Sequence, residues 1–174
     1  MLTVLIFILG ISFILYTLLG GADFGAGVVE TFTGKREERT ISNAIAPVWE
    51  ANHVWLILAV VILFTGFPLV YSSLSLVLHI PLTIALLGII ARGCSFTFRH
   101  YDITQEKPHK YYTVLFKISS FITPGFLGII LGAMIRGSIT LSTTTGFYEK
   151  FIMPWLNPFC FVMGLFSIFI FAYI

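Results

Sequence analysis

Long runs of apolar residues separated by short polar connections dominate the chain. Five runs approach or exceed the roughly 20 helical residues that cross about 30 Å of hydrocarbon. They cover residues 2–29, 47–70, 74–91, 114–135 and 154–174. The pattern predicts an all-α fold, a polytopic membrane helical bundle with about five transmembrane helices. We expect residues 1–174 to form one membrane domain, a first four-helix bundle plus the following helix.

The borders of these runs add two expectations. Pro68 and the Ser72–Ser73 pair favour a tight turn over residues 67–73, between the second and third runs. The first run lacks the basic stretch and the small-residue cleavage site of a signal peptide, so we expect it to be retained as a span.

Composition gives the same class. Apolar residues make up 57% of the 174 residues and charged residues 10%, against about 45–50% and about 25% in soluble domains. The chain is therefore expected in a membrane, in contact with lipid. Its net charge of +2 gives no sign of a nucleic-acid partner.

The positions of lysine and arginine predict the orientation. Eight lie in or beside the connections that follow the first and third runs: Lys35, Arg36, Arg39, Arg92, Arg99, Lys107, Lys110 and Lys117. Two, Arg136 and Lys150, lie between the fourth and fifth runs. Basic residues favour the cytoplasmic side, so the N-terminus is predicted outside the cell. The fifth run ends without a polar tail, which suggests an incomplete or split polypeptide.

Polar residues at the edges of the apolar runs are the candidates for chemistry. Asp23 lies in GGADFGAG, where Gly21 and Gly25 have the spacing of a helix-packing patch. One interpretation is a carboxylate at a helix end or in a loop. The other is a buried carboxylate that relays protons, and the spacing does not choose between them.

Glu50 and His53 lie three residues apart, on one helical face, between Trp49 and Trp55. Ionisable groups within a span usually face a partner or a proton path, so Glu50 is a candidate relay. The alternative is a residue anchored in an aromatic belt at the membrane interface. His53 either shares a proton with Glu50 or is a hydrogen-bonded packing histidine.

Other polar and small residues are predicted to serve structure. Arg92 and Arg99 follow the positive-inside rule, with pairing to Glu50 or Asp23 as the alternative. Gly125, Gly128 and Gly132 predict a close-packed stripe, and His79 a satisfied polar residue. No cysteine and histidine spacing typical of zinc or attached haem is present, so no metal ligand is predicted.

The chain resembles subunit II of the cytochrome bd quinol oxidases. The resemblance rests on GGADFGAG, TGKREERTISNAIAPVWEANHVWL, FPLVYSSLSLVLHIPL, ARGCSFTFRH and WLNPF, in the family's order and spacing. It covers the N-terminal half of the family's usual length. It implies a bacterial or archaeal cell-membrane complex in which a partner, subunit I, binds haem b, haem d and quinol. The implied reaction is quinol oxidation coupled to reduction of oxygen to water, and no cofactor is expected on this chain.

The resemblance also implies roles for residues. The family's acids on a cytoplasmic proton route match Asp23 and Glu50, and Trp49, Asn52 and Trp55 belong to the same motif. Two positions depart from the family: Thr97 stands where an acid is frequent, and His53 where Glu or Gln is frequent. A hydroxyl cannot release and regain a proton as a carboxylate does. A split or degenerate member is therefore also consistent with the sequence.

Two other functions fit some of these features. Glycine-rich spans with membrane-edge acids also occur in small transporters, but the internal repeat typical of many transporters is not visible. An assembly scaffold without a proton role would tolerate Thr97. Co-purification with a haem-bearing membrane partner would separate both from an oxidase subunit.

The predicted orientation can be tested by cysteine-accessibility labelling in intact cells. A cysteine introduced at Glu38 should be protected from a membrane-impermeant reagent, because the basic connection that holds it is predicted in the cytoplasm. Labelling of that cysteine from outside would overturn the orientation.

Overall fold

The computed structural model describes residues 2–33, 40–41, 44–47, 49–101, 108–137, 139 and 146–174, the side chains of residues 50, 100, 101 and 108–110 excepted. Within these ranges all regular structure is helical. The helices are α1 (Leu2–Leu15), the π-helical turn η1 (Tyr16–Gly20), α2 (Gly21–Glu30), α4 (Trp49–Gly66), α5 (Pro68–Val77), α6 (His79–Tyr101), α7 (Pro108–Arg136), α8 (Phe147–Phe151) and α9 (Pro158–Tyr173). The predicted all-helical bundle is confirmed.

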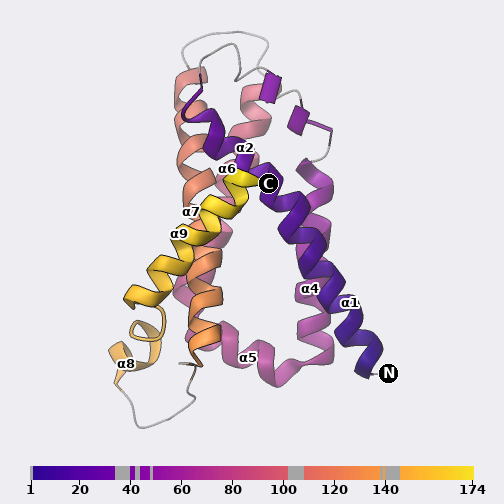
Figure 1. Ribbon diagram of the computed structural model, residues 1–174, viewed down its shortest axis with the longest axis vertical. Helices are drawn as coiled ribbons and strands as arrows, with labels where there is room; N and C mark the ends of the chain where they lie inside the picture. Colours follow the sequence, from indigo (N-terminus) through magenta and orange to yellow (C-terminus); the bar gives the residue numbers. More distant parts are fainter. Residues whose placement is uncertain are drawn as a thin grey trace.

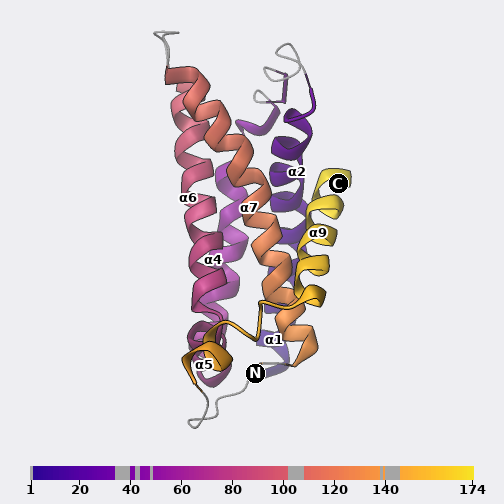
Figure 2. The ribbon, with the colours of Figure 1, turned by 90° about the vertical axis from the view of Figure 1, so that its left-hand side faces the viewer.

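The helices form two arms that meet at one end of the molecule (Figure 1). One arm holds α1 and α4, and the other holds α6, α7 and α9. Helix α5 joins α4 to α6 at the opposite end, near the N-terminus. Helix α2 continues α1 through η1 and lies where the arms meet. Figure 2 shows α6 beside α7, with α9 against the far side of α7.

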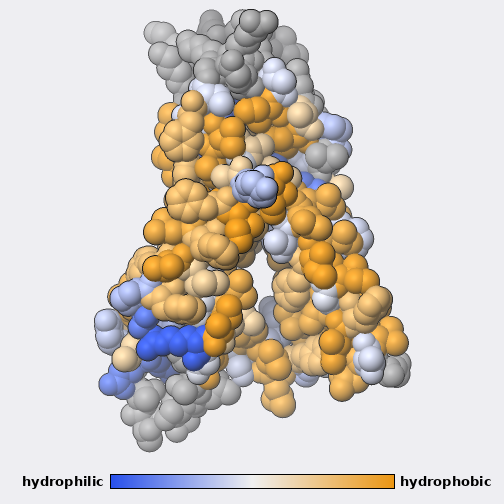
Figure 3. All heavy atoms as spheres, viewed as in Figure 1, coloured by the Kyte–Doolittle hydropathy of each residue, from blue (hydrophilic) through white to orange (hydrophobic). Residues whose placement is uncertain are grey.

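Within the described residues, three helical stretches are long and apolar enough to cross a membrane: Leu2–Glu30, His79–Arg99 and Tyr111–Arg136. A fourth span is possible if Ala51–Gly66 and Pro68–Val77, bent by 115°, act together. The predicted fifth run contains α9, which has 16 residues and is shorter than a typical span. Apolar residues cover both arms (Figure 3).

The expected tight turn over residues 67–73 is wrong. The chain breaks at Phe67 (φ −135°, ψ 57°), and Pro68 then begins α5. Proline suits the first helical position because its φ is already helical and its missing N–H would be unpaired there. The hydroxyls of Ser72 and Ser73 donate to the carbonyl of Leu69, so they fold back onto the helix.

The third span differs from its predicted bounds of 74–91. The helix begins at His79 and continues to Tyr101, so that Arg92 and Arg99 lie inside it. The prediction ended the span at the first arginine because an unpaired charge is costly in a membrane. Both arginines are buried in ion pairs, which allows the helix to continue.

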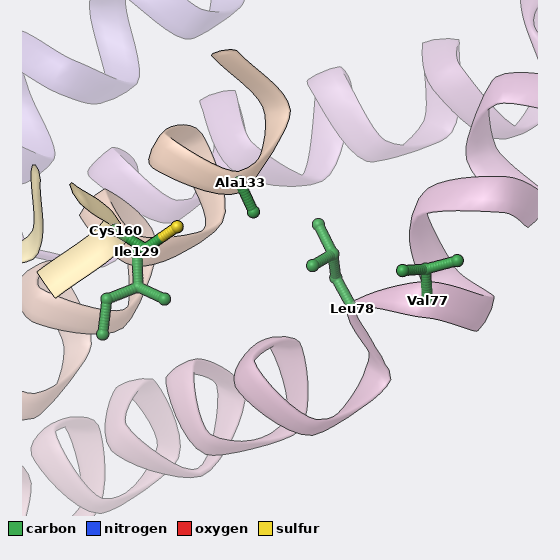
Figure 4. Packing of buried hydrophobic residues seen from close by; sticks show 5 residues of the cluster. All are labelled: Val77, Leu78, Ile129, Ala133 and Cys160. Carbon is green, nitrogen blue, oxygen red and sulfur yellow. The ribbon is translucent and has the colours of Figure 1, made fainter. Parts of the chain in front are cut away.

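The buried side chains form three clusters. The first joins the α5–α6 break to α7 and α9 through Val77, Leu78, Ile129, Ala133 and Cys160 (Figure 4). The second contains Tyr16, Phe24 and Phe171, which connect η1 and α2 to α9. The third contains Ile45, Phe96 and Phe116, near the end where the arms meet.

Glycines allow α9 to approach its neighbours closely, as the spacing predicted. A Cβ at Gly25 would lie 1.7 Å from the carbonyl oxygen of Phe171. A Cβ at Gly128 would lie 2.5 Å from the carbonyl oxygen of Met163. Side chains at these positions would push α9 away from α2 and α7.

Candidate functional site

Two buried ion pairs connect α2 to α6. Arg92 Nη2 lies 2.9 Å from Asp23 Oδ1, and both side chains are almost fully buried. About two helical turns further along both helices, Arg99 binds both carboxylate oxygens of Glu30, with Nη2 3.0 Å from Oε2. The Glu30 side chain is 0% exposed. The two pairs together place two positive and two negative side chains inside the bundle, and their charges cancel.

The two pairs have the same separation in sequence, 69 residues. Asp23 and Glu30 are seven residues apart on α2, as are Arg92 and Arg99 on α6. Seven residues span about two helical turns, roughly 10.5 Å. Because the order is the same on both helices, α2 and α6 run in the same direction, in register.

Helix α7 supplies the surface against which both arginines lie. The guanidinium carbons of Arg92 and Arg99 are 4.5 Å and 4.4 Å from the centroid of the Phe116 ring. Arg92 is also 4.7 Å from the centroid of Phe24. A desolvated guanidinium over an aromatic face is attracted by the ring quadrupole. Phe116 is fully buried and thus joins the two pairs into one unit.

Arg92 makes further hydrogen bonds that fix its position. It donates to the Ser120 hydroxyl and to the backbone carbonyl of Asp23. Gly27 leaves the room for this contact, because a Cβ there would lie 2.8 Å from Arg92 Nη1. A buried ion pair is stable only when its remaining donors and acceptors are also paired, and Arg92 meets much of that condition.

The structure gives partners to Asp23, Arg92 and Arg99. Asp23 is buried within a continuous helix, so its placement at a helix end or in a loop is wrong. Arg92 pairs with Asp23, one of the two acids considered for it. Arg99 pairs with Glu30, which sequence reasoning missed. The signal was present, because the seven-residue spacing of Asp23 and Glu30 matches that of the two arginines.

The motif of the second predicted span joins α4 to the other helices. Asn52 is buried, and its Nδ2 donates to the carbonyl oxygen of Leu19 in η1 at 3.2 Å. Trp49 packs on Phe96 of α6, with ring centroids 5.4 Å apart. Trp55 packs against the cluster of Tyr16, Phe24 and Phe171.

Glu50 and His53 lie one turn apart near the start of α4. The Glu50 side chain lies outside the described part of the structure. His53 Nδ1 is buried and has no hydrogen-bond partner among the described residues. The hydrogen bond of the neighbouring Asn52 to Leu19 places the start of α4 against η1, one turn before Asp23 in the chain.

Two other predicted positions have ordinary backbone partners. The Thr97 hydroxyl donates to the carbonyl of Gly93 at 2.9 Å. His79 Nδ1 lies 3.0 Å from the carbonyl oxygen of Leu76, which confirms that it is a satisfied polar residue. No group of three or more His, Cys, Asp or Glu suited to a metal ion occurs in the described ranges.

Comparisons with known proteins agree on one family. The family model for cytochrome bd terminal oxidase subunit II matches residues 1–174. The cytochrome bd ubiquinol oxidase subunit 2 of Bacillus subtilis is 35% identical over 75% of this chain and 39% of its own length. The cytochrome bd-I ubiquinol oxidase subunit 2 of Escherichia coli is 28% identical over 92% of this chain and 43% of its own. A putative cytochrome bd menaquinol oxidase subunit II of Bacillus subtilis is 30% identical over 78% and 38%. The chain spans about two fifths of the length of these relatives.

The ion pairs predict a specific pattern of stability. Arg92→Met should lower the free energy of unfolding by about 3–5 kcal/mol, because it leaves Asp23 buried without its partner. The double variant Asp23→Asn/Arg92→Met should lose less than the sum of the two single variants. Unfolding of the chain in detergent micelles gives the three values.

Arg136→Met is the matched control, since Arg136 is exposed at the end of α7. It should change the free energy by no more than about 0.5 kcal/mol. Strict additivity of Asp23→Asn and Arg92→Met would mean that the two side chains do not stabilise one another.

Proposed function

Since the chain belongs to the cytochrome bd terminal oxidase subunit II family, we propose that it serves a membrane quinol oxidase as the subunit that ligates no haem. The oxidase would oxidise quinol and reduce oxygen to water. This subunit would support assembly and deliver protons from the cytoplasm. One relative is named for ubiquinol and another for menaquinol, so quinol is the substrate class proposed.

The proposed partner is the haem-bearing subunit I, with haem b and haem d. Large apolar side chains are exposed along the outer surface of several helices, among them Phe7 of α1 and Phe166 and Phe169 of α9. Lipid and a neighbouring membrane subunit are the surroundings in which such a surface is stable. The proposed location is a bacterial cell membrane, with the N-terminus outside.

The proposed proton route runs from Glu50 to His53 and on to Asp23. The observation that carries it is the buried Asp23–Arg92 ion pair, together with an imidazole nitrogen on α4 that has no hydrogen-bond partner among the described side chains. Glu50 and His53 are three residues apart on α4, so they lie on one helical face. A route of this kind needs polar groups in steps across a low-dielectric span.

Asp23 would do more than carry a proton. A proton that reaches its carboxylate removes the negative charge that faces Arg92. Transfer through Asp23 would therefore weaken the contact between α2 and α6 while the proton is bound. The second pair, Glu30 with Arg99, would hold the two helices together during that time.

An assembly scaffold is the second candidate function. The observation that favours it is that Asp23 and Arg92 already pair with one another, so each is explained without proton transfer. The Thr97 hydroxyl, which donates a hydrogen bond to the carbonyl of Gly93, also supplies no titrating group for a proton route. The two functions predict different turnover for a variant in which the Glu50 carboxyl group is replaced by one that cannot titrate.

Substitutions at Glu50 test the proton role. Glu50→Gln keeps the shape and removes the titrating proton, so the complex should assemble while oxygen consumption falls at least tenfold. General acid and base groups typically contribute 10²–10⁴-fold. Glu50→Asp should keep part of the activity, because the carboxylate is drawn back by one methylene. Oxygen consumption in membranes with equal amounts of assembled complex gives the rates.

Asp23→Asn should reduce turnover as Glu50→Gln does, and the double variant should lose little more than either single variant. Wild-type turnover in Glu50→Gln would end the proton role and leave the scaffold. The purified complex also tests the partnership. Stoichiometric haem absorbance in the chain without any partner would contradict it.

A further inference from the structure

Two buried polar atoms of η1 and α4 have no hydrogen-bond partner among the side chains that the structure describes. They are the Tyr16 hydroxyl and His53 Nδ1. Tyr16 is only 6% exposed and packs in one cluster with Phe24, whose ring centroid lies 4.7 Å from the Arg92 guanidinium carbon. Buried polar groups in folded proteins almost always have a partner in the protein or in ordered water. The two atoms therefore need an explanation.

Packing alone does not explain the tyrosine. Its ring packs with Phe24 and Phe171 in one buried cluster. The ring also lies over Gly20, where an added Cβ would be 3.1 Å from the ring. A phenylalanine would fill the same apolar space without burying a hydroxyl. Tyr16 also begins η1, and π-helical turns frequently mark functional sites.

The histidine reaches the same region from α4. Asn52, its neighbour in sequence, donates to the carbonyl of Leu19, three residues after Tyr16. This bond holds the start of α4 against η1. The two atoms thus belong to two helical segments, η1 and α4, that this hydrogen bond joins.

We propose that the Tyr16 hydroxyl and His53 Nδ1 bind ordered water beside the Asp23–Arg92 ion pair. Water both donates and accepts, so it can pair with a phenol and with either tautomer of an imidazole. Buried waters typically make about three hydrogen bonds to groups that would otherwise be unsatisfied. The phenol, the imidazole and the Asp23 carboxylate supply partners of that kind.

The third unpaired atom, Thr123 Oγ1, carries no such site. It lies against Gly88, where a Cβ would be 2.3 Å away. That spacing marks close contact between α6 and α7.

The water site would add a step to the proposed proton route, and its role in proton transfer rests on that proposed function. A protonated His53 would give its Nδ1 proton to the water while the water gives one of its own to the Asp23 carboxylate. One proton then moves from imidazolium to carboxylate, and the water is regenerated. The existence of the site does not depend on that transfer.

Removal of the hydroxyl tests the site through stability. Tyr16→Phe should lower the melting temperature of the full chain in detergent micelles by about 2–4 °C, the shift expected for one lost hydrogen bond in a chain of this size. Tyr111→Phe, at an exposed tyrosine, should leave it unchanged. An unchanged or raised melting temperature in Tyr16→Phe would overturn the proposal, because an unpaired buried hydroxyl is better removed.

Substitutions of the histidine separate water binding from packing. His53→Leu should lower the melting temperature. His53→Gln should lower it much less, because an amide still binds water. The double variant Tyr16→Phe/His53→Leu should lose less than the sum of its parts. A His53→Gln variant as unstable as His53→Leu would contradict the water site.

Infrared spectroscopy detects the water itself. Exchange from ordinary water into H₂¹⁸O should shift an O–H stretching band of the complex that is missing from Tyr16→Phe and present in Tyr111→Phe. A spectrum in which Tyr16→Phe keeps every water band would overturn the proposal. These measurements do not use turnover, so wild-type turnover in Glu50→Gln would end the proton route without affecting them.

Discussion

A charge inside a membrane-spanning helix must be neutralised by the protein that buries it, and this constraint organises the bundle. Arg92 and Arg99 lie within α6, where the surrounding helices and lipid offer little water. Each is paired with an acid from α2, and Phe116 of α7 lies against both guanidinium groups. The two pairs fix the register of α2 against α6 and place α7 beside them. Changes at these four charged residues would therefore disturb three helices together.

Other features follow from that register. Gly27 lets Arg92 and Ser120 come close to α2, and Gly25 lets α9 approach α2 from the other side. Asn52 then joins α4 to η1 through the carbonyl of Leu19. Helices α1 and α4 diverge from the remaining helices beyond this point (Figure 1). The polar contacts thus concentrate where the arms meet, and the arms themselves are held by apolar packing.

Much of this arrangement could be predicted from the sequence, because hydrophobic length and small-residue spacing are local signals. The all-helical fold and the glycine contacts of α9 rest on such signals, whereas the pairing of Arg92 with Asp23 was only the alternative to the positive-inside interpretation. Pro68 was misjudged because proline is compatible with both a turn and the first residue of a helix. The end of α6 was misjudged because the cost of an arginine in a span depends on a partner from another helix. Glu30 was missed for the same reason, although its spacing from Asp23 repeats that of the arginines. The Glu50 side chain and the orientation in the membrane stay predictions.

The central claim is that paired charges hold α2 in parallel register with α6. A charge exchange at the Glu30–Arg99 pair tests it most directly, with the amount of folded chain in the membrane as the readout. Glu30→Arg and Arg99→Glu, each alone, place two like charges in contact inside the bundle, and each should abolish most of the folded chain. The exchanged variant Glu30→Arg/Arg99→Glu restores opposite charges and should recover a substantial part of it. Wild-type amounts of folded chain in either single variant would contradict the account. So would an exchanged variant with no more folded chain than the less stable of the two single variants.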